Sequence, residues 1–207
     1  MLLDLQGPAG RLEALLDEGA TPPRAAVVFG HPHPMHGGTM HTKAVYQGAK
    51  GLTRIGCSVL RFNFRGVGSS EGTFDEGAGE MEDFRTGLDF MAARYPGVPL
   101  WAAGFSFGSR IALETGADDP RVSALIGIAP PVNREGYTWD RTLLTEKPKF
   151  FVQGDLDELC PLKDMWAFYA RLKEPKELVV IDGARHLFEG KTKEVGEALE
   201  DLLGDFE

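Results

Sequence analysis

The stretch Trp101-Ala102-Ala103-Gly104-Phe105-Ser106-Phe107-Gly108-Ser109-Arg110 decides the fold of this chain. The apolar run before it predicts a buried strand over residues 99–103, and residues 109–115 predict a helix. The turn between them contains Gly-x-Ser-x-Gly, in the strand–turn–helix context that this pattern requires. Glycine is needed two positions either side of the serine because larger side chains there would collide. We interpret Ser106 as a nucleophile, with an ordinary loop serine as the alternative.

Length and composition predict one domain, residues 1–207, with a substantial core. The net charge of −9 argues against nucleic acid and anionic membranes as partners. The two cysteines, Cys57 and Cys160, make neither a disulfide framework nor a metal-ligand spacing, and Cys57 is expected to be a small buried hydrophobe. We see no secretory signal and no apolar run of membrane-spanning length, so we expect a cytoplasmic location.

Short apolar runs alternate with amphipathic stretches along the chain. Strands are predicted at 2–6, 11–16, 25–29, 58–64, 99–103, 122–129, 149–153 and 177–181, and helices at 39–55, 79–95, 109–115, 164–172 and 192–203. This alternation predicts an α/β domain with a mostly parallel sheet covered by helices on both faces. The connection over residues 130–147 is too short for a cap domain. Its Tyr137 and Trp139 either form a low rim or pack the loop onto the sheet.

A serine hydroxyl becomes a nucleophile when a base takes its proton and a carboxylate orients that base. Of the five histidines, only His186 follows Ser106, and it comes directly after the last predicted strand. Sites gather at the carboxyl ends of strands in such sheets, so His186 is the candidate base. The residues alone leave four candidate acids after the later strands: Asp155, Asp157, Glu158 and Asp182. Asp155 has the alternative role of bracing its turn.

The order Ser106, Asp157, His186 resembles the catalytic triad of the serine α/β-hydrolase superfamily. The spacing of Gly154, Asp157 and Pro161 matches the superfamily's Gly-x-x-Asp-x-x-x-Pro, and this resemblance implies Asp157 as the acid. The motifs Gly30-His31-Pro32 and Arg65-Gly66-Val67-Gly68-Ser69 resemble the family's oxyanion-loop entry and its Arg-Gly-x-Gly-x-Ser loop. The likeness is greatest to small, capless predicted hydrolases near the dienelactone-hydrolase and prolyl-oligopeptidase branches.

An oxyanion hole needs two N–H donors aimed at the developing negative charge. The backbone of Phe107, which follows the nucleophile, is expected to supply one donor. Pro32 and Pro34 have no N–H, which leaves the backbones of His33, Met35 and His36 as candidates for the second donor. The resemblance implies His33.

The histidines of the same loop raise the alternative of a metal site. They are His31, His33, His36 and His41. No carboxylate or cysteine lies among them, so we expect a structural or oxyanion loop and no metal. The glycine-rich stretches at Gly66 and Gly190 fail the spacing of nucleotide-binding loops, so no cofactor is expected.

The resemblance implies a serine hydrolase that cleaves a small carboxylic ester or thioester through an acyl-enzyme intermediate. A peptidase or amidase with the same three residues is the nearest alternative, and a non-catalytic binding protein of the same fold is another. Without a cap, little apolar wall is expected around a long acyl chain. We therefore expect short acyl groups, of about two to four carbons, to be preferred.

Overall fold

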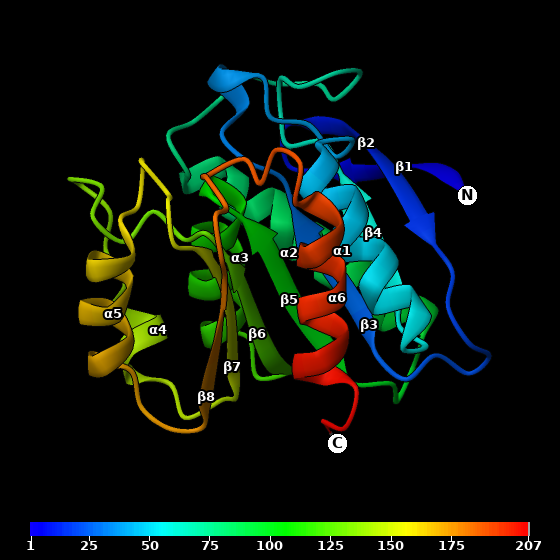
Figure 1. The fold of residues 1–207 in the computed structure, drawn as a ribbon. Helices are drawn as coiled ribbons and strands as arrows, with labels where there is room; N and C mark the ends of the chain where they lie inside the picture. The colour runs from blue at the N-terminus through cyan, green and yellow to red at the C-terminus, as the bar shows by residue number, and fades with distance from the viewer. Residues whose placement is uncertain (207) are drawn as a thin grey trace.

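The computed structural model describes residues 1–206 and contains one eight-stranded sheet with helices on both faces (Figure 1). The strands are β1 (Leu2–Gly7), β2 (Gly10–Asp17), β3 (Ala26–Gly30), β4 (Ser58–Phe62), β5 (Leu100–Phe105), β6 (Val122–Ile128), β7 (Lys149–Gly154) and β8 (Lys176–Ile181). The helices are α1 (Lys43–Arg54), α2 (Ala78–Arg94), α3 (Phe107–Asp118), α4 (Asp140–Leu144), α5 (Leu162–Arg171) and α6 (Thr192–Leu203), with a 3₁₀ turn, η1 (Pro34–His36).

The strand order is β1-β2-β4-β3-β5-β6-β7-β8. β1 and β2 form an antiparallel hairpin, β2 pairs antiparallel with β4, and all later pairs are parallel. The predicted mostly parallel α/β sheet is therefore confirmed. Gly30, the last residue of β3, pairs with Gly104 of β5. This register places the loop after β3 directly beside the turn that carries Ser106.

The two faces of the sheet pack against different helices, because side chains alternate along each strand. Val27 and Phe29 belong to the core under α1 and α6, whereas Ala26 and Val28 belong to the core under α2, α3 and α5. Figure 1 shows α1 and α6 side by side in front of the sheet, and these two helices share many contacts. Cys57 and Cys160 are both buried and unbonded to each other, and Cys57 belongs to the first core, as a small hydrophobe would.

One helix begins later than the sequence predicts. The expected helix over 39–55 begins only at Lys43, because a turn precedes it in which the Thr42 N–H donates to the Thr39 carbonyl. The connection over 130–147 is irregular apart from the short helix α4, and it adds no cap domain. Trp139, at the start of α4, is buried and its ring lies 5.1 Å from that of Phe168. Of the two expectations for Trp139, packing of the loop onto the domain is the one observed.

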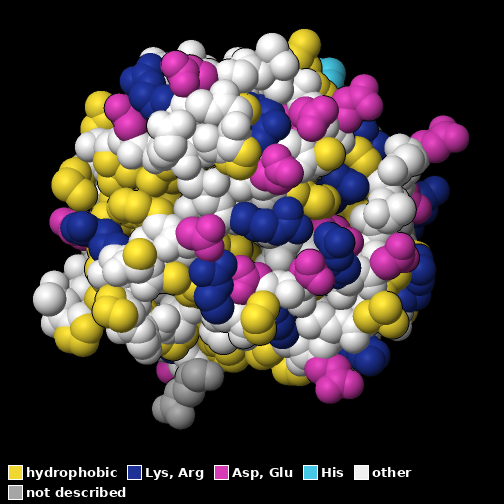
Figure 2. All heavy atoms as spheres, turned by 180° about the vertical axis from the view of Figure 1, so that it is seen from behind, with side chains coloured by type: hydrophobic (Ala, Val, Ile, Leu, Met, Phe, Trp, Pro, Cys, Tyr) yellow, Lys and Arg dark blue, Asp and Glu magenta, His cyan; other side chains and the backbone are white. Residues whose placement is uncertain are grey.

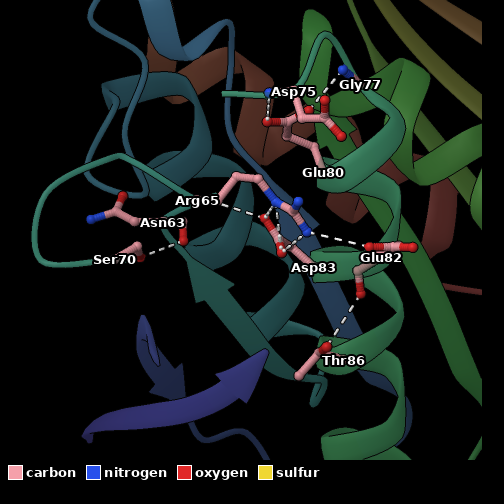
Figure 3. Close-up of polar contacts among 9 residues, drawn as sticks. All are labelled: Asn63, Arg65, Ser70, Asp75, Gly77, Glu80, Glu82, Asp83 and Thr86. Carbon is pink, nitrogen blue, oxygen red and sulfur yellow. Dashed lines mark hydrogen bonds and ion pairs between the residues drawn. The ribbon is translucent and has the colours of Figure 1, made fainter. Parts of the chain in front are cut away.

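The Arg-Gly-x-Gly loop after β4 is anchored to α2 by a buried ion pair (Figure 3). Arg65 Nη2 lies 2.8 Å from Asp83 Oδ1, and Arg65 Nε donates to Asp83 Oδ2 at 3.0 Å. Glu80 caps the start of α2 by accepting the backbone N–H groups of Asp75 and Gly77. Both carboxylates are buried, so these bonds fix the loop firmly against the helix.

Basic and acidic side chains are interspersed over the face shown in Figure 2. Within residues 1–206, no helix has the length and apolar character needed to cross a membrane.

Candidate active site

The turn between β5 and α3 holds Ser106 in a conformation that L-residues rarely adopt, with φ 53° and ψ −120°. The flanking glycines permit it through close backbone approaches. A Cβ on Gly104 would lie 2.1 Å from the Gly108 carbonyl oxygen, and a Cβ on Gly108 would lie 2.4 Å from the carbonyl carbon of Gly30. A side chain at either glycine would therefore collide with the backbone, as the sequence predicts. At Gly108 the collision would be with the end of β3. The result is a half-exposed serine at the carboxyl edge of the sheet.

Three side chains from three loops form one hydrogen-bonded chain. His186 Nε2 lies 2.9 Å from Ser106 Oγ, and His186 Nδ1 lies 2.8 Å from Asp157 Oδ2. Asp157 follows β7 and His186 follows β8, so all three stand at the carboxyl ends of parallel strands. His186 and Asp157 are both buried.

The carboxylate of Asp157 is held by donors from its own loop and strand. Its Oδ1 accepts the N–H groups of Leu159 and Cys160, at 2.9 Å and 2.8 Å, and its Oδ2 accepts Gln153 Nε2 at 2.9 Å. With these oxygens acting as acceptors, the remaining contact requires His186 Nδ1 to donate. His186 Nε2 is then free to accept a proton from Ser106.

The other three candidate acids are placed differently. Asp182 is exposed, and Asp155 Oδ1 is buried without a hydrogen-bond partner in the described part of the chain, so it does not brace the turn through that oxygen. Glu158 Oε2 accepts the backbone N–H of His186 at 3.3 Å and thus contacts the histidine loop, not its ring. The structure accordingly brings Asp157 to the imidazole.

Phe107 and His33 both border the same pocket as Ser106. In residues 1–206, neither of their backbone amides donates a hydrogen bond to another backbone group. The His33 ring packs 5.1 Å from that of Phe107, and its Nδ1 accepts the N–H of Met35. The imidazole of His33 thus shapes η1, while its amide stays available to a ligand.

His31 holds this loop in place from the interior. Its Nδ1 lies 2.7 Å from the Pro32 carbonyl oxygen, and its Nε2 accepts the Phe64 N–H at 3.0 Å. The Pro32 carbonyl belongs to the same peptide unit as the His33 N–H. The fully buried imidazole therefore fixes the orientation of that unit, and burial lowers the pKa of His31 to about 4.

The four histidines of the loop do not converge. His31 is buried, His33 and His36 border the pocket, and His41 is exposed. Across the described chain, no group of three or more His, Cys, Asp or Glu side chains is arranged to hold a metal ion.

Sequence reasoning missed several residues of the site. Gln153 is fully buried and bridges Asp157 Oδ2 and the Cys160 carbonyl. A polar residue directly after the apolar run Phe150-Phe151-Val152, shortly before the acid, was the available signal. The pocket of about 620 Å³ over Ser106 is also bordered by Arg134, Tyr137, Leu159 and Leu187. Tyr137 thus forms part of a rim, whereas Trp139 does not.

Comparison with known proteins gives the family. Residues 21–146, which include Ser106, match the family model described as serine aminopeptidase, S33. The chain belongs to this α/β-hydrolase family. The matched part ends before Asp157 and His186.

Relatives of this α/β-hydrolase match it over nearly their whole length. An α/β serine hydrolase homologue from Coxiella burnetii is 38% identical, with a TM-score of 0.91 and coverage of 98% of this chain and 97% of that one. A protein from Xanthomonas campestris, described as an α/β serine hydrolase without a lid, is 32% identical, with a TM-score of 0.87 and coverage of 97% and 92%. An uncharacterized protein of Rickettsia prowazekii is 36% identical, covering 95% of this chain and 86% of its own.

The buried His31 makes stability depend on pH. Its pKa is about 4 in the folded state, below the ordinary value of 6.5, so below pH 6.5 the unfolded chain takes up a proton that the folded protein does not. Stability is therefore full above pH 6.5 and declines as the pH falls towards 4. Between pH 7 and pH 5 we expect this group to remove about 2 kcal/mol from the free energy of unfolding, measured by urea denaturation.

The matched variants are His31→Gln and His41→Gln. His31→Gln is expected to lower stability at pH 7 and to lose this part of the pH dependence, whereas His41→Gln, at an exposed position of the same segment, keeps it. An unchanged pH dependence in His31→Gln contradicts the assignment.

Proposed function

We propose that this α/β-hydrolase cleaves small carboxylic esters or thioesters through an acyl-enzyme formed on Ser106. The observation that carries the proposal is the continuous chain from Ser106 Oγ through His186 to Asp157, with contacts of 2.9 Å and 2.8 Å. Nucleophile, base and orienting acid within hydrogen-bond reach of one another are the requirements of acyl transfer by serine.

In the acylation step, Ser106 Oγ attacks the carbonyl carbon of the ester while its proton passes to His186 Nε2. The carbonyl oxygen becomes an oxyanion, which accepts hydrogen bonds from the amides of Phe107 and His33. Asp157 orients the ring and stabilises the imidazolium. The tetrahedral intermediate then expels the alcohol or thiol, which takes the proton from His186, and leaves the acyl group on Ser106.

Deacylation repeats these steps with water as the nucleophile. His186 Nε2 takes a proton from the water as its oxygen attacks the acyl carbon, and the same two amides hold the second oxyanion. Ser106 Oγ leaves with the proton from His186, and the carboxylic acid is released.

A peptidase would use the same three residues, and the family's description names an aminopeptidase. An aminopeptidase binds the α-ammonium group of its substrate, for which carboxylates are the complementary partners. Glu158 is the single acidic side chain among the described residues that border the pocket, against Arg134 and three histidines. This charge pattern favours an ester over a peptide with a free amino terminus.

Three sequence-based expectations accompany the proposal. The pocket is expected to prefer acyl groups of about two to four carbons. The substrate is expected to be a small molecule, and the reaction is expected to take place in the cytoplasm. All three stay predictions.

Replacing the nucleophile tests the proposal. Ser106→Ala removes the attacking oxygen, so kcat for short-chain 4-nitrophenyl esters is expected to fall by about 10⁴-fold or more while the protein stays folded. Ser123→Ala, at an exposed position of β6, is the matched control and is expected to retain full turnover. Turnover near the wild-type level in Ser106→Ala, or no turnover in the wild type, overturns the proposed function.

The acid is tested by comparing three aspartates. Asp157→Asn loses the charge that orients His186 and is expected to lower kcat by about 10³-fold to 10⁴-fold. Among the described residues, the side chains of Asp155 and Asp182 form no hydrogen bond with Ser106, Asp157 or His186. Asp155→Asn and Asp182→Asn are therefore expected to change kcat by less than about threefold. Melting temperatures are measured alongside to separate unfolding from lost chemistry. Loss of turnover in folded Asp182→Asn contradicts the role of Asp157.

A further inference from the structure

Two arginines lie against one aromatic ring at the edge of the pocket. The guanidinium carbon of Arg110, on α3, is 4.4 Å from the centroid of the Tyr137 ring, and that of Arg134 is 5.3 Å from it. The electron-rich ring attracts both cations and holds them in the same region. Two like charges brought this close repel each other, so the arrangement favours a negative charge beside them.

No acidic side chain of residues 1–206 forms an ion pair with either arginine. Among the described residues, neither Arg110 nor Arg134 has a carboxylate oxygen within 4.0 Å. Arg110 also has its Nε and Nη1 buried without hydrogen-bond partners. The acids nearby accept hydrogen bonds from other groups: Glu80 accepts two backbone N–H groups, and Glu114 accepts the backbone N–H and the hydroxyl of Thr142. Burial lowers the pKa of Arg110, and the charge of Glu114 opposes this shift only in part.

Arg134 and Tyr137 border the pocket that contains Ser106. His33 borders the same pocket, and burial, with the charges of His36 and Arg134, lowers the pKa of His33 to about 4, so its imidazole is neutral near pH 7. Glu158 is the opposing charge, and its Oε2 already accepts the His186 N–H. Arg134, with Arg110 on the other contact of the Tyr137 ring, makes this side of the pocket cationic in a chain of net charge −9, which raises the local concentration of anions.

We propose that the pocket selects esters that carry a carboxylate group, which Arg134 binds while Arg110 adds its charge from behind Tyr137. This inference rests on the proposed function and names its substrate class. The guanidinium of Arg134 presents parallel N–H groups that match a planar carboxylate. No lysine is among the described residues that border the pocket, so the receptor is one arginine fork, whose two parallel N–H groups match the two oxygens of a carboxylate.

Two matched ester pairs test the selection. Ethyl butyrate and monoethyl succinate differ by a carboxylate on the acyl half, and phenyl acetate and 4-acetoxybenzoate differ by one on the alcohol half. In the wild type, kcat/KM is expected to be about tenfold higher for the carboxylated member of at least one pair. This preference is expected to shrink as salt screens the charges.

Arg134→Gln removes the receptor at an exposed position, so the fold is retained. It is expected to lower the ratio of kcat/KM, carboxylated over neutral, by about tenfold. Arg171→Gln, at an exposed position of α5, changes net charge equally and is expected to leave the ratio unchanged. The inference is overturned if the wild-type ratio is one or less for both ester pairs. It is also overturned if Arg134→Gln lowers kcat/KM equally for the carboxylated and the neutral ester.

Binding without turnover separates this inference from the proposed function. In the Ser106→Ala protein, calorimetry gives the Kd of monoethyl succinate and of 4-acetoxybenzoate, and adding Arg134→Gln is expected to raise the Kd of the favoured ester about tenfold. An unchanged Kd, or no binding of either ester, overturns the carboxylate site. Failure of the wild type to hydrolyse the neutral esters instead overturns the proposed function, while the Kd values still decide the inference.

Discussion

The backbone contact between Gly108 and the end of β3 is the constraint on which the site depends. A Cβ on Gly108 would lie 2.4 Å from the Gly30 carbonyl carbon and 2.5 Å from the His31 carbonyl oxygen. Any larger residue would push the turn at Ser106 away from the loop that contains His33. Because the two proposed oxyanion donors belong to these two segments, their spacing is set by this contact and not by side chains. The same close backbone approaches at Gly104 and Gly108 surround Ser106, whose φ is positive.

Buried polar groups hold the remaining loops at this edge of the sheet. His31 ties the loop after β3 to the loop after β4, Arg65 ties the latter to α2, and Gln153 ties Asp157 to its own strand. Each of these side chains is less than a tenth exposed. A hydrogen bond in such surroundings is costly to break, because the abandoned partner stays out of water. The site is thus rigid without a cap over it.

Much of the fold followed from local sequence, because short apolar strands and amphipathic helices leave strong periodic signals. Ser106 and His186 followed from the glycine pattern and from chain order, and Asp157 from its resemblance to a family spacing. The short helix α4 gave no such signal, because five residues span little more than one turn. The contact between Arg110 and Tyr137 could not be predicted either, because it depends on the path of an irregular connection.

The central claim is that the histidine–aspartate chain activates Ser106, and covalent labelling tests it most directly. A fluorophosphonate probe reacts with an activated serine, and mass spectrometry of the digested protein locates the adduct. We expect one equivalent of probe on the peptide that contains Ser106, and none after the protein is unfolded before labelling. Failure of the folded protein to react, or a comparable adduct on other serines, would contradict the account.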